Sequence, residues 1–94
     1  DYFRLRKPLD RRIYELARKH CGNQPKWRVT MATLHAKSGS QDKLYKFRAA
    51  MKALAATNEL PDYRMAFSVE KDMMTFYARG PKGGRSQMLD LLSS

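Results

Sequence analysis

The spacing of hydrophobic residues changes along the chain, and each change marks a predicted element. Near the N-terminus, YFRLRK alternates apolar and basic residues, which fits a short strand or an extended arm. Ile13, Leu16 and their neighbours then recur at helical spacing between Pro8 and Gly22. Proline favours the first turn of a helix and glycine its end, so we expect a helix over residues 8–21.

A strand and a short helix are predicted next. KWRVT, residues 26–30, combines aromatic and β-branched side chains and predicts a brief strand. Thr30 suits the cap of a helix over residues 31–37, and Gly39 suits the turn that ends it. The four-residue segment SGSQ would then connect this helix to the following one.

The following helix is predicted over about residues 41–58, with Ser40 as its cap. Its buried side is an apolar stripe at i, i+3, i+7 and i+10, formed by Leu44, Phe47, Met51 and Leu54. The opposite side is polar and mostly basic, with Asp42, Tyr45, Lys46, Ala49 and Lys52, and with Arg48 beside them. Small Ala49 would allow another surface to approach this face closely.

The C-terminal third predicts a β-hairpin and a tail. Strands are expected from Tyr63 to about Glu70 and over residues 73–79, with a turn at Lys71 and Asp72. Met65, Phe67 and Val69 should share one face of the first strand. GPKGG then reads as a flexible linker, followed by a short amphipathic tail that could form a turn or two of helix. Its apolar MLDLL could dock on the domain, mediate dimerisation or extend into solvent.

The order helix, strand, helix, turn, helix, hairpin is typical of a winged helix, a small α+β fold. Its second and third helices form a helix-turn-helix, and the third enters the major groove of DNA. We therefore predict a winged-helix domain over residues 1–79 and a linker with its tail over residues 80–94. The chain begins with Asp1 rather than Met, which suggests a piece of a longer protein.

Charge is distributed unevenly, which favours a polyanion as the partner. The net charge is +10. Residues 1–52 contain 14 Lys or Arg against 4 Asp or Glu, whereas residues 53–94 contain 5 of each. The excess therefore lies in the part that holds the three predicted helices. A uniformly solvated surface has no need of this asymmetry, but a polyanion-binding face does.

Catalytic, metal-binding and membrane functions have little support in the sequence. The single cysteine, Cys21, excludes an intramolecular disulfide and indicates a reducing compartment such as the cytoplasm. His20, His35 and Cys21 lack the spacing of a zinc site. The acidic residues suggest no acid–base pair, and no apolar run is long enough to span a membrane. We expect neither an enzyme nor a cofactor or metal.

Candidate DNA contacts come from the basic segments. Arg48 is the best candidate for reading a base, because a guanidinium can bind guanine through two hydrogen bonds. Ser40 and Gln41 would lie at a helix N-terminus, where backbone N–H groups bind phosphate. The predicted set is Arg4, Arg6, Arg11, Arg12, Arg28, Lys37, Ser38, Ser40, Gln41, Lys43, Tyr45, Lys46, Arg48, Lys52 and Lys71, with Arg64 as a further wing residue.

Several segments resemble the C-terminal region of the plasmid replication initiator protein A family. They are YFRLRKPLDRRIYELARKHCG, Trp27, KSGS and FRAAMKALAATNELPDYRM, within residues 2–79. The resemblance implies a bacterial winged-helix protein that binds repeated origin sequences, called iterons, and recruits host replication proteins. Such initiators often have two winged-helix domains, of which this chain would be one. The implied contacts are Lys37, Ser38, Ser40, Lys43, Lys46, Arg48, Arg4, Arg6, Arg11 and Arg12.

Other functions stay open at this point. A winged-helix transcription regulator would bind duplex DNA through the same helix. A winged-helix interaction module would dock an acidic protein on the basic face, and a homodimer is compatible with each alternative. Binding to RNA or single-stranded DNA would require exposed aromatic residues among the cations, and only Tyr45 meets this requirement on the basic face.

Overall fold

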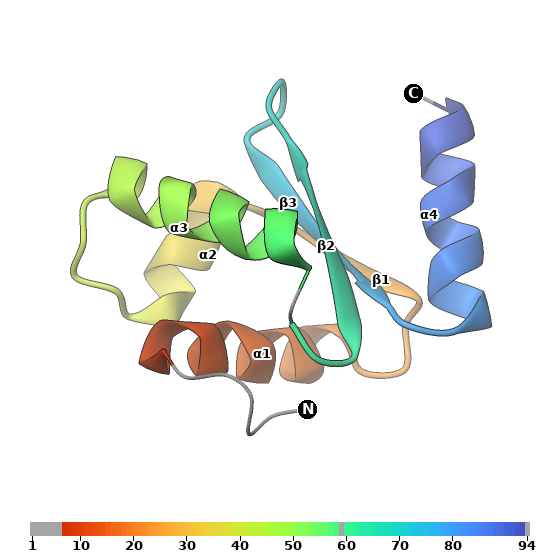
Figure 1. Cartoon of the computed structure of the whole chain (residues 1–94), viewed down its shortest axis with the longest axis horizontal. Helices are drawn as coiled ribbons and strands as arrows, with labels where there is room; N and C mark the ends of the chain where they lie inside the picture. The colour runs from red at the N-terminus through yellow and green to blue at the C-terminus, as the bar shows by residue number, and fades with distance from the viewer. Residues whose placement is uncertain (1–6, 59, 94) are drawn as a thin grey trace.

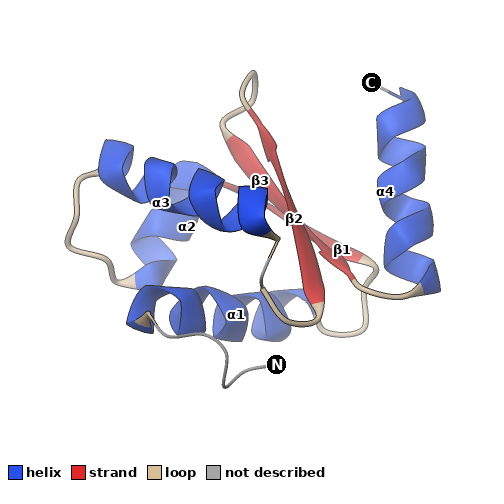
Figure 2. Ribbon diagram, viewed as in Figure 1, coloured by secondary structure: helices blue, strands red, loops and turns tan. Residues whose placement is uncertain are grey.

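A three-stranded antiparallel sheet separates two layers of helices in the computed structural model, which describes residues 7–58 and 60–93. Helices α1 (Pro8–Cys21), α2 (Met31–Ser38) and α3 (Leu44–Thr57) lie on one side of the sheet, and α4 (Pro81–Ser93) lies on the other (Figure 1). The strands are β1 (Lys26–Thr30), β2 (Tyr63–Ser68) and β3 (Met73–Ala78), arranged in the order β1-β3-β2 (Figure 2). The α+β class is therefore confirmed. The predicted N-terminal arm, with Arg4 and Arg6, lies outside the described residues.

Local sequence signals explain α1 and α2, which form where the sequence predicted them. α1 begins with Pro8 in its first turn. The Thr30 side chain accepts a hydrogen bond from the Thr33 N–H at 3.2 Å and caps α2. Gly39 follows α2 with φ +73°, a left-handed conformation that glycine adopts at no steric cost.

α3 begins at Leu44, three residues later than predicted, and the Ser40 side chain does not cap it. The Ser40 N–H donates to Ser38 Oγ at 3.2 Å, and the Asp42 N–H donates to Ser40 Oγ at 3.3 Å. In addition, the Asp42 carbonyl oxygen lies 2.7 Å from Nε2 of His35. Side-chain hydrogen bonds of this kind offer the backbone an alternative to the helix. The connection between α2 and α3 is therefore longer than the predicted turn.

The core lies between the sheet and the first three helices. The predicted stripe of α3 is confirmed, because Phe47, Met51 and Leu54 are buried and Leu44 packs against them. The strands contribute alternate residues to the same core. The buried set includes Ile13, Leu16, Val29, Met31, Leu34, Met65, Met74 and Phe76.

The hairpin follows the prediction except at its turn. β2 pairs with β3 so that Met65 lies opposite Phe76. β2 ends at Ser68, and Val69 is 77% exposed, so it does not share the buried face of Met65 as predicted. The alternation of a strand no longer sets the direction of a side chain once the chain enters the turn.

α4 occupies the place of the predicted linker, because GPKGG lies within or just before this helix. Gly83 permits the close packing, since a Cβ atom at this position would overlap the backbone carbonyl of Ala78. The division into residues 1–79 and 80–94 stays a prediction. The apolar residues of the tail are 57–77% exposed: Met88, Leu89, Leu91 and Leu92.

Candidate nucleic-acid interface

The outer face of α3 is basic and contains no acidic residue. Tyr45 is 62% exposed, and Lys46, Ala49 and Lys52 are exposed as well. No Asp or Glu occurs between Leu44 and Thr57. The small alanine side chains among the cations would let another surface come close to the helix backbone. The predicted polar face of α3 is thus present on the surface.

Cations from α1 and α2 meet at one end of the molecule. Arg11 and Arg12 are exposed near the start of α1. The Nη2 atom of Arg12 lies 3.4 Å from the carbonyl oxygen of Lys37, at the end of α2. From there the connection leads to the start of α3, and it carries exposed Lys43 together with the acidic Asp42 (Figure 1). The fold therefore joins cations that the sequence places in separate segments.

The two serines predicted to contact DNA form hydrogen bonds within the connection between α2 and α3. Ser38 is buried, and its hydroxyl donates to the carbonyl oxygen of His35 at 2.7 Å. Ser40 is half-buried and accepts the hydrogen bond from Asp42 described above. Because α3 begins only at Leu44, neither Ser40 nor the exposed Gln41 lies at its N-terminus. The predicted position of these two residues at that terminus is therefore wrong, and their contact with DNA stays a prediction.

Arg48 has a partner within the chain, which the sequence analysis missed. Its Nε atom donates to Oδ1 of Asp72 at 2.9 Å, and its Nη2 atom donates to Oδ2 at 2.7 Å. The hydrogen bonds from Arg48 lower the pKa of Asp72. The two side chains are 31% and 41% exposed. A guanidinium held in this way cannot bind a guanine edge through the same N–H groups, which disfavours Arg48 as the base-reading residue.

A second cation of α3 also contacts the hairpin. The Nζ atom of Lys52, one helical turn after Arg48, lies 5.3 Å from the centre of the Phe67 ring in β2. A cation at this distance over an aromatic face is attracted by the ring. Lys52 is nevertheless exposed, so it remains on the outer face of α3.

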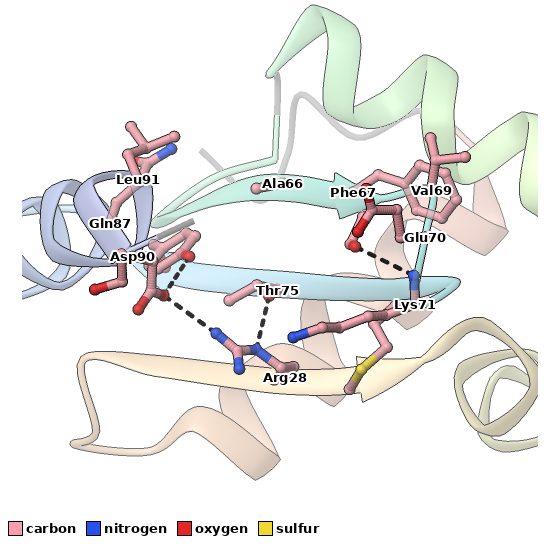
Figure 3. A pocket seen from close by; sticks show the side chains of 14 residues that line it. Arg28, Ala66, Phe67, Val69, Glu70, Lys71, Thr75, Gln87, Asp90 and Leu91 are labelled. Atoms are coloured by element: carbon pink, nitrogen blue, oxygen red, sulfur yellow. Dashed lines mark hydrogen bonds and ion pairs between the residues drawn. The ribbon is translucent and has the colours of Figure 1, made fainter.

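Arg28 lies on the opposite face of the sheet from α3. Within β1, Val29 belongs to the core and Trp27 packs against it, so Arg28 between them points the other way. There its Nη2 atom lies 3.2 Å from Oδ2 of Asp90, and its Nε atom donates to Oγ1 of Thr75 at 3.4 Å (Figure 3). Arg28 therefore lies across the sheet from the α3 cations that share its predicted set of DNA contacts. The strand alternation of KWRVT already carried the signal for this.

Asp90 is the centre of the contact between α4 and the sheet. Lys26 Nζ lies 2.8 Å from Oδ2 of Asp90, and the Tyr77 hydroxyl donates to the same oxygen at 2.6 Å. These hydrogen bonds lower the pKa of Asp90, with that from Lys26 contributing most. Burial, followed by the hydrogen bond to Asp90, raises the pKa of Tyr77 to about 12. No spacing in the sequence links Asp90 to these strands.

A hollow of about 630 Å³ lies beside this contact, between α4 and the hairpin. Lys71, exposed in the turn between β2 and β3, lines the hollow together with Arg28, Asp90 and Glu70 (Figure 3). The structure thus places Lys71 and Arg28 on the α4 side of the sheet, apart from the cations of α3. Arg64 is exposed on β2.

The residues that the structure describes contain neither a cluster of metal ligands nor a helix that could span a membrane. Among residues 7–58 and 60–93, no three His, Cys, Asp or Glu residues gather as metal ligands would. Within the same ranges, every helix is too short or too polar to cross a bilayer.

Comparison with known proteins provides evidence that is independent of this geometry. The family model of "Replication initiator protein A" matches residues 1–65, more than half of the chain. The chain belongs to the replication initiator protein A family. The resemblance found in the sequence is thereby confirmed, and the match includes α1, α2 and α3.

One relative of this initiator family member is a "Putative replication protein" from Wigglesworthia glossinidia brevipalpis. It is 47% identical over 79 residues, which cover 84% of the chain and 29% of the relative. The chain therefore spans less than a third of the length of this relative. No solved structure matches the chain.

Proposed function

We propose that this chain is a winged-helix domain that binds double-stranded DNA in a sequence-specific manner at a plasmid replication origin. In this proposal α3 enters the major groove and the β2–β3 hairpin is the wing. The observation that carries the proposal is the acid-free outer face of α3, to which the α2–α3 connection and the starts of α1 and α3 add further exposed cations.

The topology supports the winged-helix part of the proposal. A helix, a strand and two helices precede the hairpin, and β1 pairs with β3 rather than with β2. This pairing places the hairpin beside α3 and against the same core. The α2–α3 connection is longer than in the tightest helix-turn-helix motifs, but its side-chain hydrogen bonds give it a defined conformation.

The charges support duplex DNA as the ligand. Lysine and arginine side chains on an exposed face neutralise phosphates and release counterions. The exposed candidates are Arg11, Arg12, Lys37, Lys43, Lys46 and Lys52, with Tyr45 and Gln41 as polar neighbours. Four phosphate contacts among them would give a slope of log affinity against log salt of about −3.6.

The test is fluorescence anisotropy with three labelled probes: a duplex of direct origin repeats, a scrambled duplex of the same composition, and one single strand. We expect the repeat duplex to bind most tightly, with affinity falling as salt rises. Equal affinity for the repeat and scrambled duplexes would contradict sequence-specific origin binding. Binding to an acidic protein but to no duplex at low salt would instead favour an interaction module.

A pair of lysine variants locates the interface. Lys46→Ala removes a cation from the outer face of α3, whereas Lys82→Ala removes an equal charge from exposed α4 on the other side of the sheet. Lys46→Ala should reduce the magnitude of the salt slope by about 1, and Lys82→Ala should leave it nearly unchanged. The reverse pattern would place the DNA on the α4 side.

A further inference from the structure

Asp72 joins three elements at the point where the hairpin turn returns to the sheet. Its carboxylate holds Arg48 of α3 through two hydrogen bonds, at 2.9 and 2.7 Å. Its backbone carbonyl accepts a hydrogen bond from the N–H of Met31, the first residue of α2, at 2.8 Å. Its φ of +49° shows that the backbone adopts a left-handed conformation there. One residue thus links the hairpin to both helices of the candidate helix-turn-helix.

The placement of an acid here is unfavourable for DNA binding unless it has another use. Asp72 is 41% exposed and lies beside the basic helix that is proposed to face phosphates. An unpaired carboxylate near a polyanion is repelled, and this repulsion acts over about 10 Å at moderate salt. The bidentate geometry with Arg48 supplies a use, because a planar fork on a carboxylate restricts both the distance and the angle between two elements.

We propose that Asp72, through Arg48, is a positioning residue that sets the orientation of α3 relative to the hairpin for binding to DNA. This inference rests on the function proposed above. Arg48 lies one turn from Tyr45 and from Lys52, so fixing Arg48 also fixes the residues that are exposed on either side of it along α3. Arg48 then acts within the protein, and the exposed neighbours contact the DNA.

The direction in which duplex affinity changes when the charge of Asp72 is removed distinguishes this role from direct base reading by Arg48. Asp72→Asn removes a negative charge, and asparagine tolerates the left-handed backbone of this position. If Arg48 read a base directly, the substitution would release its guanidinium and affinity for the duplex would rise. If Asp72 positions α3, affinity should fall by about five- to tenfold despite the more positive charge, which is the effect of losing about one good contact.

Glu70→Gln is the matched control. Glu70 is exposed in the same turn, two residues before Asp72, so its substitution removes the same charge while leaving the pair with Arg48 in place (Figure 3). It should leave duplex affinity equal or raise it by about twofold at low salt. Tyr14→Phe controls for stability, because it removes a 2.7 Å hydrogen bond from the Tyr14 hydroxyl to Asp62, outside α3. It should lower the unfolding temperature without changing affinity.

A double-mutant cycle completes the experiment, with the full chain and the repeat duplex used throughout. In an Arg48→Met background, Asp72→Asn should cause no further loss, because its effect passes through the guanidinium. Equal affinities for Asp72→Asn and Glu70→Gln would overturn the positioning role while leaving the proposed function intact. Failure of the unmodified chain to bind any duplex would overturn the proposed function, and the positioning role with it.

Discussion

Replacing Asp90 with alanine should release α4 from the sheet while α1, α2 and α3 stay folded. The Asp90 carboxylate accepts hydrogen bonds from Lys26, Arg28 and Tyr77, which belong to β1 and β3. Few apolar contacts would replace them, because Met88 and the leucines of α4 are 57–77% exposed. α4 therefore depends on polar contacts more than the other helices do.

The free energy that Asp90 contributes to holding α4 can be estimated from how exposed its hydrogen-bond partners are. The Lys26 and Arg28 side chains are 33% and 42% exposed, so solvent screens both ion pairs, and each contributes about 0.5–1 kcal/mol. The bond from Tyr77, a residue that is 4% exposed, joins a buried hydroxyl to a carboxylate and contributes about 1.5–2 kcal/mol. Because the three bonds share one acceptor, we expect a total of about 2–3 kcal/mol.

Hydrogen exchange with mass spectrometry measures this directly. Peptides from α4 should exchange about 30- to 150-fold faster in Asp90→Ala, and peptides from α1 should be unchanged. Asp42→Ala, which removes an exposed acid in the α2–α3 connection, is the control and should not affect α4. Unchanged exchange in α4, or an equal acceleration in α1 and α4, would refute the view that Asp90 anchors α4 locally.

Acid should release α4 from the sheet, as Asp90→Ala should. The pKa of Asp90 is lowered in the folded chain, first by the hydrogen bond from Lys26 and then by that from Tyr77. Its contribution to stability is therefore present above the pKa of an unfolded aspartate, about 3.9, and is lost as the pH falls through the lower folded value. NMR shifts of α4 should change in this range for the unmodified chain. Equal acid-induced changes in Asp90→Ala would contradict this assignment.

Three other tests address single contacts. Gly83→Ala should loosen α4, because the added Cβ would overlap the Ala78 backbone. Gly84→Ala is the control, since a Cβ there would meet open space. Equal hydrogen exchange of α4 in the two variants would contradict this. Burial, followed by the hydrogen bond to Asp90, raises the pKa of Tyr77 to about 12. The contribution of protonated Tyr77 to folding stability is therefore present below the unfolded pKa of about 10 and is lost as the pH rises through about 12. Absorbance at alkaline pH should show one late-ionising tyrosine fewer in Tyr77→Phe than in the unmodified chain, in which the pKa values of Tyr14 and Tyr63 are raised as well. Ser38→Ala should cost about 1–2 kcal/mol of unfolding free energy in urea titrations, because it removes the hydroxyl that holds the α2–α3 connection; a neutral result would show that the turn forms without it.

Elements with local signals could be predicted from the sequence. α1 and β1 have the predicted boundaries, and the buried stripe of α3 is the predicted one. Each depends on contacts between near neighbours, such as the Thr30 cap, or on periodicity within one element. The start of α3 was missed because three side chains bind backbone groups of the connection. The start of α4 within GPKGG was missed because two adjacent glycines are typical of a linker, and only the Ala78 backbone shows why position 83 requires glycine.

The sequence by itself determined the charge, the order of the elements and which side of α3 faces solvent, because composition and periodicity are properties of neighbouring residues. Tertiary structure decided which cations remain available to a ligand. Arg48 is paired across 24 residues and Arg28 across 62, with carboxylates on other elements. Periodicity assigns a residue to a face of its own element, but the residue opposite it depends on how the elements pack. For this reason Lys46 is exposed on α3 as a candidate DNA contact, whereas Arg48 is paired with Asp72 of the hairpin turn.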